Sequence, residues 1–116
     1  MKAVLLRLQS PDILDLSSWV STGDFGIIVQ LIVGPDSGPG EESFDITLCT
    51  TGWLAERVKT RGIFDGRHHF IVGDYDYRRI ERYLGSRISE FEDASWQGLA
   101  NKISRIGHWE FEDYYE

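Results

Sequence analysis

The amino-acid sequence predicts an α+β fold: a mostly antiparallel sheet of about four to five strands with three helices packed against it. Two observations lead to this prediction. Segments with strand-like alternation or continuous apolar character dominate the first half of the chain, and segments with apolar residues at helical spacing dominate the second half. The chain is 116 residues long and 41% hydrophobic, which is enough for a single domain, residues 1–116, with its own core.

Three strands are expected in the first half. Residues 3–8 form the first of them, and a Ser-Pro-Asp sequence ends it. Residues 25–33 are almost continuously apolar, with Gln30 the only polar member, which indicates a central strand covered on both faces. Residues 43–49 alternate strictly between apolar and polar side chains. Because Gly and Pro crowd residues 34–40, the second and third strands are expected to form a wide hairpin.

A short helix and a fourth strand come next. Thr50 or Thr51 can cap the helix, and Gly62 is placed to end it. Residues 67–72 have the composition of a further strand.

Two helices and a final strand complete the chain. Asp74 or Asp76 caps the longer helix, Ser95 caps the last one, and Gly107 is expected to end it. Trp109 and Phe111 then alternate with glutamates, so a short strand with both aromatic rings facing the core is expected. The apolar positions at helical spacing are Ile80, Tyr83, Leu84, Ile88 and Phe91 in the longer helix, and Trp96, Leu99, Ala100, Ile103 and Ile106 in the last.

Charge is unevenly distributed along the chain, whose net charge is −7. Residues 1–56 carry a net −6, residues 57–89 a net +4, and residues 90–116 a net −5. The acidic ends argue against nucleic acid as a partner, since binding phosphate requires clustered Lys and Arg. With one cysteine, Cys49, no secretory signal and no apolar run that could span a membrane, we expect a cytoplasmic protein without a membrane partner.

Residue patterns typical of catalysis are weak, and we expect no catalytic residues, cofactor or metal. His68 and His69 are neighbours on a strand and point to opposite faces, so the pair cannot bind one metal ion. The glycine-rich residues 34–40 precede a strand rather than a helix, which excludes the usual phosphate-binding geometry. An enzyme that uses His68, His69 or His108 beside a carboxylate remains the alternative.

The acidic, aromatic C-terminus has the strongest features of a binding surface. Its carboxylates would attract a basic partner, and its tyrosines offer rigid contact area; a frayed, solubilising terminus is the equally weighted alternative. The arginines of the longer helix, at positions 78, 79 and 82, are interpreted as a solvated or self-paired patch. The candidate partner-binding residues are Asp36, Glu41, Glu42, Glu110, Glu112, Asp113, Tyr114, Tyr115 and Glu116.

Four segments of the sequence resemble a known family. They are Ser10-Pro11-Asp12-Ile13; Gly40-Glu41-Glu42-Ser43-Phe44 with Cys49 and Trp53-Leu54; Gly66-Arg67-His68-His69-Phe70-Ile71-Val72 with Tyr75-Asp76; and Trp96 followed by Arg105-Ile106-Gly107-His108-Trp109-Glu110-Phe111-Glu112-Asp113-Tyr114. In their order and spacing, over nearly the whole chain, they resemble the immunity protein 8 family of bacterial polymorphic toxin systems.

The resemblance implies a non-enzymatic antitoxin that binds a cognate protein toxin and blocks its active site or the approach of its substrate. The acidic ends of the chain fit a toxin with a basic surface, such as a nuclease, and this is a hypothesis from the charge distribution. A homo-oligomeric scaffold without a toxin partner is the third interpretation, and a homodimer remains open.

Overall fold

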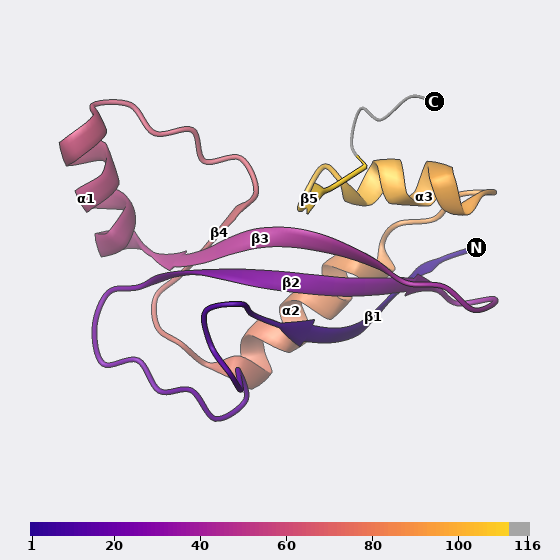
Figure 1. The fold of residues 1–116 in the computed structure, drawn as a ribbon, viewed down its shortest axis with the longest axis horizontal. Helices are drawn as coiled ribbons and strands as arrows, with labels where there is room; N and C mark the ends of the chain where they lie inside the picture. The colour runs from indigo at the N-terminus through magenta and orange to yellow at the C-terminus, as the bar shows by residue number, and fades with distance from the viewer. Residues whose placement is uncertain (112–116) are drawn as a thin grey trace.

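The computed structural model describes residues 1–111 and has the predicted α+β class. Its sheet is mixed but mostly antiparallel, with strand order β1-β2-β3-β4, and a short β5 pairs with the edge of β3 that also carries β4 (Figure 1). The elements are β1 (Ala3–Gln9), β2 (Gly26–Pro35), β3 (Glu42–Thr50), α1 (Thr51–Arg61), β4 (His69–Val72), α2 (Tyr77–Ser89), α3 (Trp96–Ile103) and β5 (His108–Trp109).

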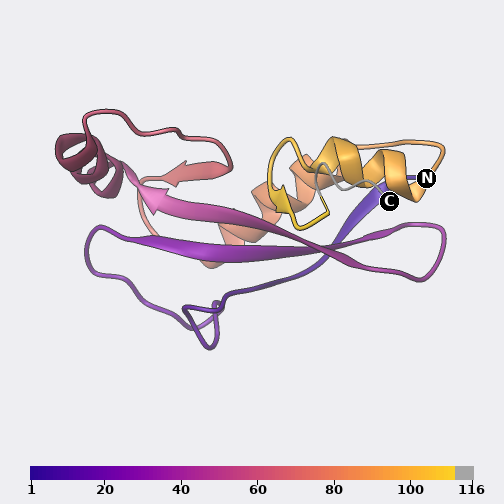
Figure 2. The same cartoon turned by 45° about the horizontal axis from the view of Figure 1, so that its top comes forward.

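The predicted hairpin is confirmed. β2 and β3 pair antiparallel along their length, from Gly26 opposite Cys49 to Val33 opposite Glu42. The expectation that β2 is covered on both faces is wrong for its first half, where the side chain of Ile28 is 40% exposed. The helices α2 and α3 lie on one face of the sheet only, so alternate residues of β2 meet different environments (Figures 1 and 2).

The hydrophobic core lies between the sheet and these two helices. Burial alternates along β3, where Phe44, Ile46 and Leu48 point toward the helices. Burial of this kind is the main stabilising contribution in a domain of this size. The other fully or nearly fully buried members are Ala3, Val29, Leu31, Val33, Leu84, Ile88, Leu99, Ala100 and Ile103.

The first helix is attached to the sheet differently from the other two. None of the residues of α1 is buried, and α1 lies at the end of the sheet away from α3 (Figure 1). Its Trp53 ring covers Gly26 of β2, where an added Cβ would come within 2.2 Å of the indole. Glycine at this position therefore lets an aromatic ring hold α1 against the sheet.

Three of the predicted helix boundaries are confirmed. The side chain of Asp76 accepts a hydrogen bond from the Arg79 N–H, and that of Ser95 accepts one from the Gly98 N–H, so each caps its helix. Gly62 follows α1 with φ of 79°, and its N–H donates to the Val58 carbonyl.

The predicted role of Gly107 is wrong. α3 ends at Ile103, and Gly107 instead lies against β3, where an added Cβ would be 3.0 Å from the Cβ of Phe44. Glycine is needed here because the backbone approaches the sheet closely before β5.

The fourth strand is shorter than predicted and runs parallel to β3. It begins at His69, because His68 has a φ of 62°, a left-handed conformation that interrupts an extended strand. Among residues 1–111, no helix has the length and apolar character needed to cross a membrane.

Candidate partner-binding surface

The acidic candidate residues that the structure describes lie around the end of the β2–β3 hairpin. The hairpin closes tightly, since a Cβ added to Gly34 would be 2.6 Å from the Gly40 carbonyl oxygen, and Gly40 has a φ of 123°. Asp36 lies within this loop, and Glu41 and Glu42 follow it directly. The sequence places these acids near a glycine-rich turn, and the pairing of the two strands holds them at one end of the molecule (Figure 1).

Asp36 connects the hairpin to the N-terminus. Its carboxylate accepts a hydrogen bond of 2.9 Å from the backbone N–H of Lys2, and its own N–H donates to the Lys2 carbonyl at 2.9 Å. The N-terminal ammonium group of Met1 donates to the carbonyl of Asp93. Asp36 therefore has a structural role in addition to its negative charge.

Glu41 is paired with Arg7 of β1. Both carboxylate oxygens accept from the guanidinium, at 2.8 and 3.1 Å, and both side chains are about half exposed. The hydrogen bonds from Arg7 lower the pKa of Glu41, and the same hydrogen bonds raise the pKa of Arg7. Exposed pairs of this kind contribute little to stability, but this one reduces the charge that Glu41 offers to a partner.

Glu42 and Glu110 are brought together by the last strand. The indole Nε1 of Trp109 donates to the Glu42 carboxylate at 3.3 Å, and the Trp109 ring stacks on Phe44 at 6.1 Å between centroids. β5 pairs Trp109 with Phe44 and runs antiparallel to β3, so the next residue, Glu110, emerges beside the start of β3. Glu110 is exposed, and unlike Asp36, Glu41 and Glu42 it forms no hydrogen bond or ion pair within residues 1–111.

Sequence reasoning missed Asp45 as a member of this acidic group. Asp45 is half-buried and lies opposite His108 in the β3–β5 register, three residues along β3 from Glu42. Its position follows from the pairing of β5 with β3, which no local sequence pattern announces. We refer to Asp36, Glu41, Glu42, Asp45 and Glu110 as the acidic hairpin end.

The remaining candidates, Glu112, Asp113, Tyr114, Tyr115 and Glu116, lie outside the described residues. The expected burial of both aromatic rings near the C-terminus holds for Trp109, which is 4% exposed, and fails for Phe111, which is 40% exposed. β5 ends at Trp109, so Phe111 no longer follows the alternation of a strand.

The histidines have structural surroundings. His68 Nε2 lies 2.9 Å from the Ser104 carbonyl oxygen, and His69 Nδ1 lies 2.7 Å from that of Arg67. The His69 ring also contacts Trp53 and Phe64. Within residues 1–111, no three His, Cys, Asp or Glu side chains gather as metal ligands would. The burial of Cys49 raises the pKa of its thiol, which disfavours the reactive thiolate.

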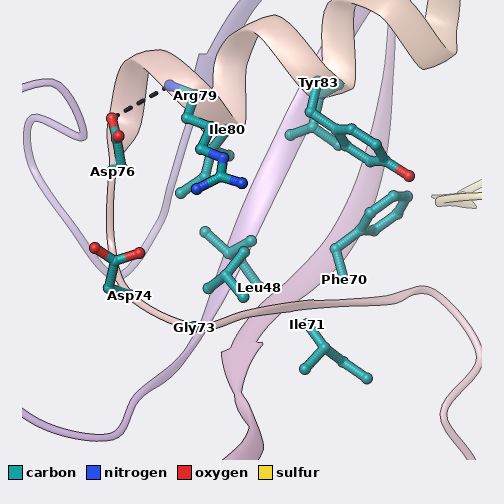
Figure 3. Close-up of a pocket in the computed structure, with 11 residues that line it drawn as sticks. Leu48, Phe70, Ile71, Gly73, Asp74, Asp76, Arg79, Ile80 and Tyr83 are labelled. Carbon is teal, nitrogen blue, oxygen red and sulfur yellow. Dashed lines mark hydrogen bonds between the residues drawn. The ribbon is translucent and has the colours of Figure 1, made fainter.

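A groove that the sequence did not predict lies between β4 and α2 (Figure 3). It has a volume of about 440 Å³ and is lined mainly by Leu48, Phe70, Val72, Ile80 and Tyr83. Neither this groove nor a second cavity, beside Trp19 and Tyr75, is lined by a histidine.

One arginine of α2, Arg79, lines the groove, and Arg78 lines the second cavity. Arg78, Arg79 and Arg82 are exposed, and none of them forms an ion pair within the part of the chain that the structure describes. The predicted pairing of this patch with the chain's own acids is therefore not seen among those residues, whereas the predicted solvent exposure is.

Comparison with known proteins gives one match. A family model described as Immunity protein 8 matches residues 3–114, nearly the whole chain. No curated protein and no solved structure matches the chain.

Proposed function

The chain belongs to the immunity protein 8 family, and on that premise we propose that it neutralises a cognate toxin by binding it through the acidic hairpin end. Membership of the family makes the chain an immunity protein of a toxin system. The toxin's identity and the mode of inhibition are inferred from the surface. The single observation that carries the inference is the convergence of acids from the hairpin, β3 and the segment after β5.

The acidic hairpin end favours a toxin with a basic surface. Glu110 is exposed and Glu41 keeps about half of its side chain accessible, so both can contact a partner. Clustered charge of one sign increases the rate of association with a partner of the opposite sign. A nuclease fits this description, because it needs a basic surface to bind its substrate. An immunity protein bound there would block the active site or the approach of nucleic acid.

The proposal is tested by co-expressing the chain with the toxin domain encoded in the adjacent reading frame. Rescue of growth and recovery of a stable complex are the expected results. The dissociation constant should rise about tenfold or more between roughly 0.05 M and 0.5 M salt, because screening shortens the range of exposed charges. If co-expression neither restores growth nor yields a complex, the proposed function is contradicted.

Charge variants locate the surface. Glu110→Lys should weaken binding about tenfold or more, mainly through slower association. Glu42→Gln removes a charge but keeps an oxygen that can accept the hydrogen bond from Trp109. Its effect on binding therefore measures the charge of Glu42, while the hydrogen bond that supports β5 stays in place. Glu56→Lys, an equal change on α1 at the other end of the sheet, is the matched control and should bind like the wild type. Equal losses in Glu110→Lys and Glu56→Lys would show that only net charge matters, and would contradict the acidic hairpin end as the interface.

A further inference from the structure

The edge of β4 is the exposed edge of the sheet on this side. β4 pairs with β3 alone among the described strands, and Figure 2 shows it as the outermost strand there. The Thr47 N–H donates to the His68 carbonyl at 2.9 Å, and Thr47 lies opposite His69. In a parallel ladder, every second residue of a strand directs its backbone N–H and C=O toward the same neighbouring strand. The backbone groups of Phe70 and Val72 therefore point toward β3, and the N–H and C=O of Ile71 point away from it.

An unpaired edge can add a further strand. Natural proteins protect such edges with charge, proline, bulges or a covering element. β4 contains no proline, aspartate, glutamate, lysine or arginine, and Ile71 is 55% exposed. The features that usually prevent pairing are therefore missing from the strand itself.

The groove next to β4 would receive the side chains of an added strand. Figure 3 shows Phe70 and Tyr83 at one end of it, and Ile71 pointing away from α2. Tyr83 is 55% exposed, and its ring meets that of Phe70 at 6.2 Å between centroids. An extended segment beside β4 would thus place every second side chain against an apolar wall.

Charge on α2, which carries four arginines and one glutamate, favours an acidic segment. Arg79 lines the groove, with its side chain directed toward it from α2 (Figure 3). Arg82 lies three residues further along the same helix, whereas Arg78 lines the second cavity with Glu81. Asp76 also lines the groove, but its carboxylate caps α2 through the Arg79 N–H, and Asp74 lies at the end away from Tyr83. A second copy would bring its own arginines to the same edge, and like charges would oppose pairing of β4 with β4.

We propose that β4 and its groove bind an extended segment of the toxin, in which apolar residues alternate with acids, by adding it to the sheet as a new strand. This inference rests on the proposed function and names a second contact in the same complex. The acidic hairpin end would attract the basic surface of the toxin, and β4 would hold one segment by backbone hydrogen bonds. Arg79, with Arg82 three residues further along α2, would select acids in that segment over basic residues.

The test measures binding of the purified toxin domain from the adjacent reading frame to variants at β4. Ile71→Pro removes the outward N–H while leaving the bonds of Phe70 and Val72 to β3, and proline is tolerated on edge strands. We expect about tenfold weaker binding, because an interfacial backbone hydrogen bond is lost. Ile71→Thr keeps the N–H and the β-branched shape, and should bind within about threefold of wild type.

Two further measurements do not depend on how Ile71→Pro folds. Arg79→Glu should weaken binding about tenfold, and Lys59→Glu, an equal change on α1, should not. In the wild-type complex, hydrogen exchange of the Ile71 amide should slow about tenfold or more relative to the free protein.

The outcomes separate this inference from the proposed function. A complex that forms with unchanged exchange at Ile71 and equal affinity in all four variants overturns the β4 contact, while the proposed function stands. Absence of any complex overturns both. If the chain alone is a dimer that Ile71→Pro makes monomeric, β4 pairs with a second copy, and the assignment to the toxin is wrong.

Discussion

Replacing Trp109 by alanine tests whether one indole ring holds β5 on the sheet. Trp109 is 4% exposed, stacks on Phe44, meets Phe111 edge to face at 5.7 Å, and donates to Glu42. β5 is only two residues long, so its backbone pairing with β3 is too short to be stable by itself. The ring should therefore supply most of the free energy that fixes this segment.

The expected loss of stability follows from these contacts. Truncating a buried Trp to alanine costs about 3–5 kcal/mol, including the cavity that remains. The hydrogen bond to Glu42 is long at 3.3 Å and half-exposed, so it adds little. Because β5 lies at the end of the core and can partly collapse, we expect about 3–4 kcal/mol, a large share of the roughly 5–15 kcal/mol typical of a domain.

The assay is urea and thermal unfolding followed by far-UV circular dichroism. At about 4 °C per kcal/mol for a chain of this length, the midpoint temperature should fall by about 12–16 °C. Phe111→Ala is the matched control, because it removes a neighbouring aromatic ring that is 40% exposed. It should cost about 1 kcal/mol or less.

Equal effects of the two substitutions, both near 1 kcal/mol, would refute the reasoning, since burial would then not distinguish the two rings. A second readout connects stability with binding. If Trp109 fixes Glu110 beside Glu42, Trp109→Ala should also slow association with the toxin below the unfolding midpoint. Unchanged association would show that the acids need no such support.

Two further predictions concern single residues with unusual surroundings. Burial raises the pKa of Tyr75 to about 12, and the Tyr75 hydroxyl donates to the Leu16 carbonyl. The neutral phenol therefore stabilises the folded state fully below the ordinary pKa of 10.0, and this contribution to stability is lost as pH rises through about 12. As pH rises over this range, the urea concentration at the unfolding midpoint should fall less steeply in Tyr75→Phe than in the wild type. Equal slopes would contradict the assignment of this pH dependence to Tyr75. At His68, whose φ is 62°, His68→Gly should be about 1 kcal/mol more stable than His68→Ala, because both lose the contact with Ser104 but only glycine relieves the left-handed backbone. Chemical denaturation of the pair measures this difference, and an alanine variant as stable as the glycine variant would contradict the strain.

Local patterns predicted most of the elements. Alternation along β3 and the Gly-Pro turn before it indicated the hairpin, and the capping residues Asp76 and Ser95 marked the starts of α2 and α3. These signals are reliable because strand alternation and helix capping depend on residues within a few positions of each other. The errors fall where distant contacts decide, as at Gly107, which meets Phe44 instead of ending a helix.

The candidate surface was predictable only in part. The sequence showed that Glu41, Glu42 and Glu110 are acids near a turn and near the C-terminus, but it could not show that Arg7 already pairs with Glu41. Asp45 was missed for the same reason, because the pairing of β5 with β3 joins residues far apart in the chain. The groove beside β4 was missed because parallel pairing of β4 leaves no signal in the sequence.

The sequence by itself determined the fold class, the hairpin, the helix starts and the uneven charge, all of which depend on composition or on neighbouring residues. Only the tertiary structure decided which acids share a surface, which strand forms the free edge, and which arginines lack a partner among residues 1–111. The physical reason is that these properties depend on strand order and packing, which bring together residues such as Glu42 and Trp109 that are 67 positions apart in the chain.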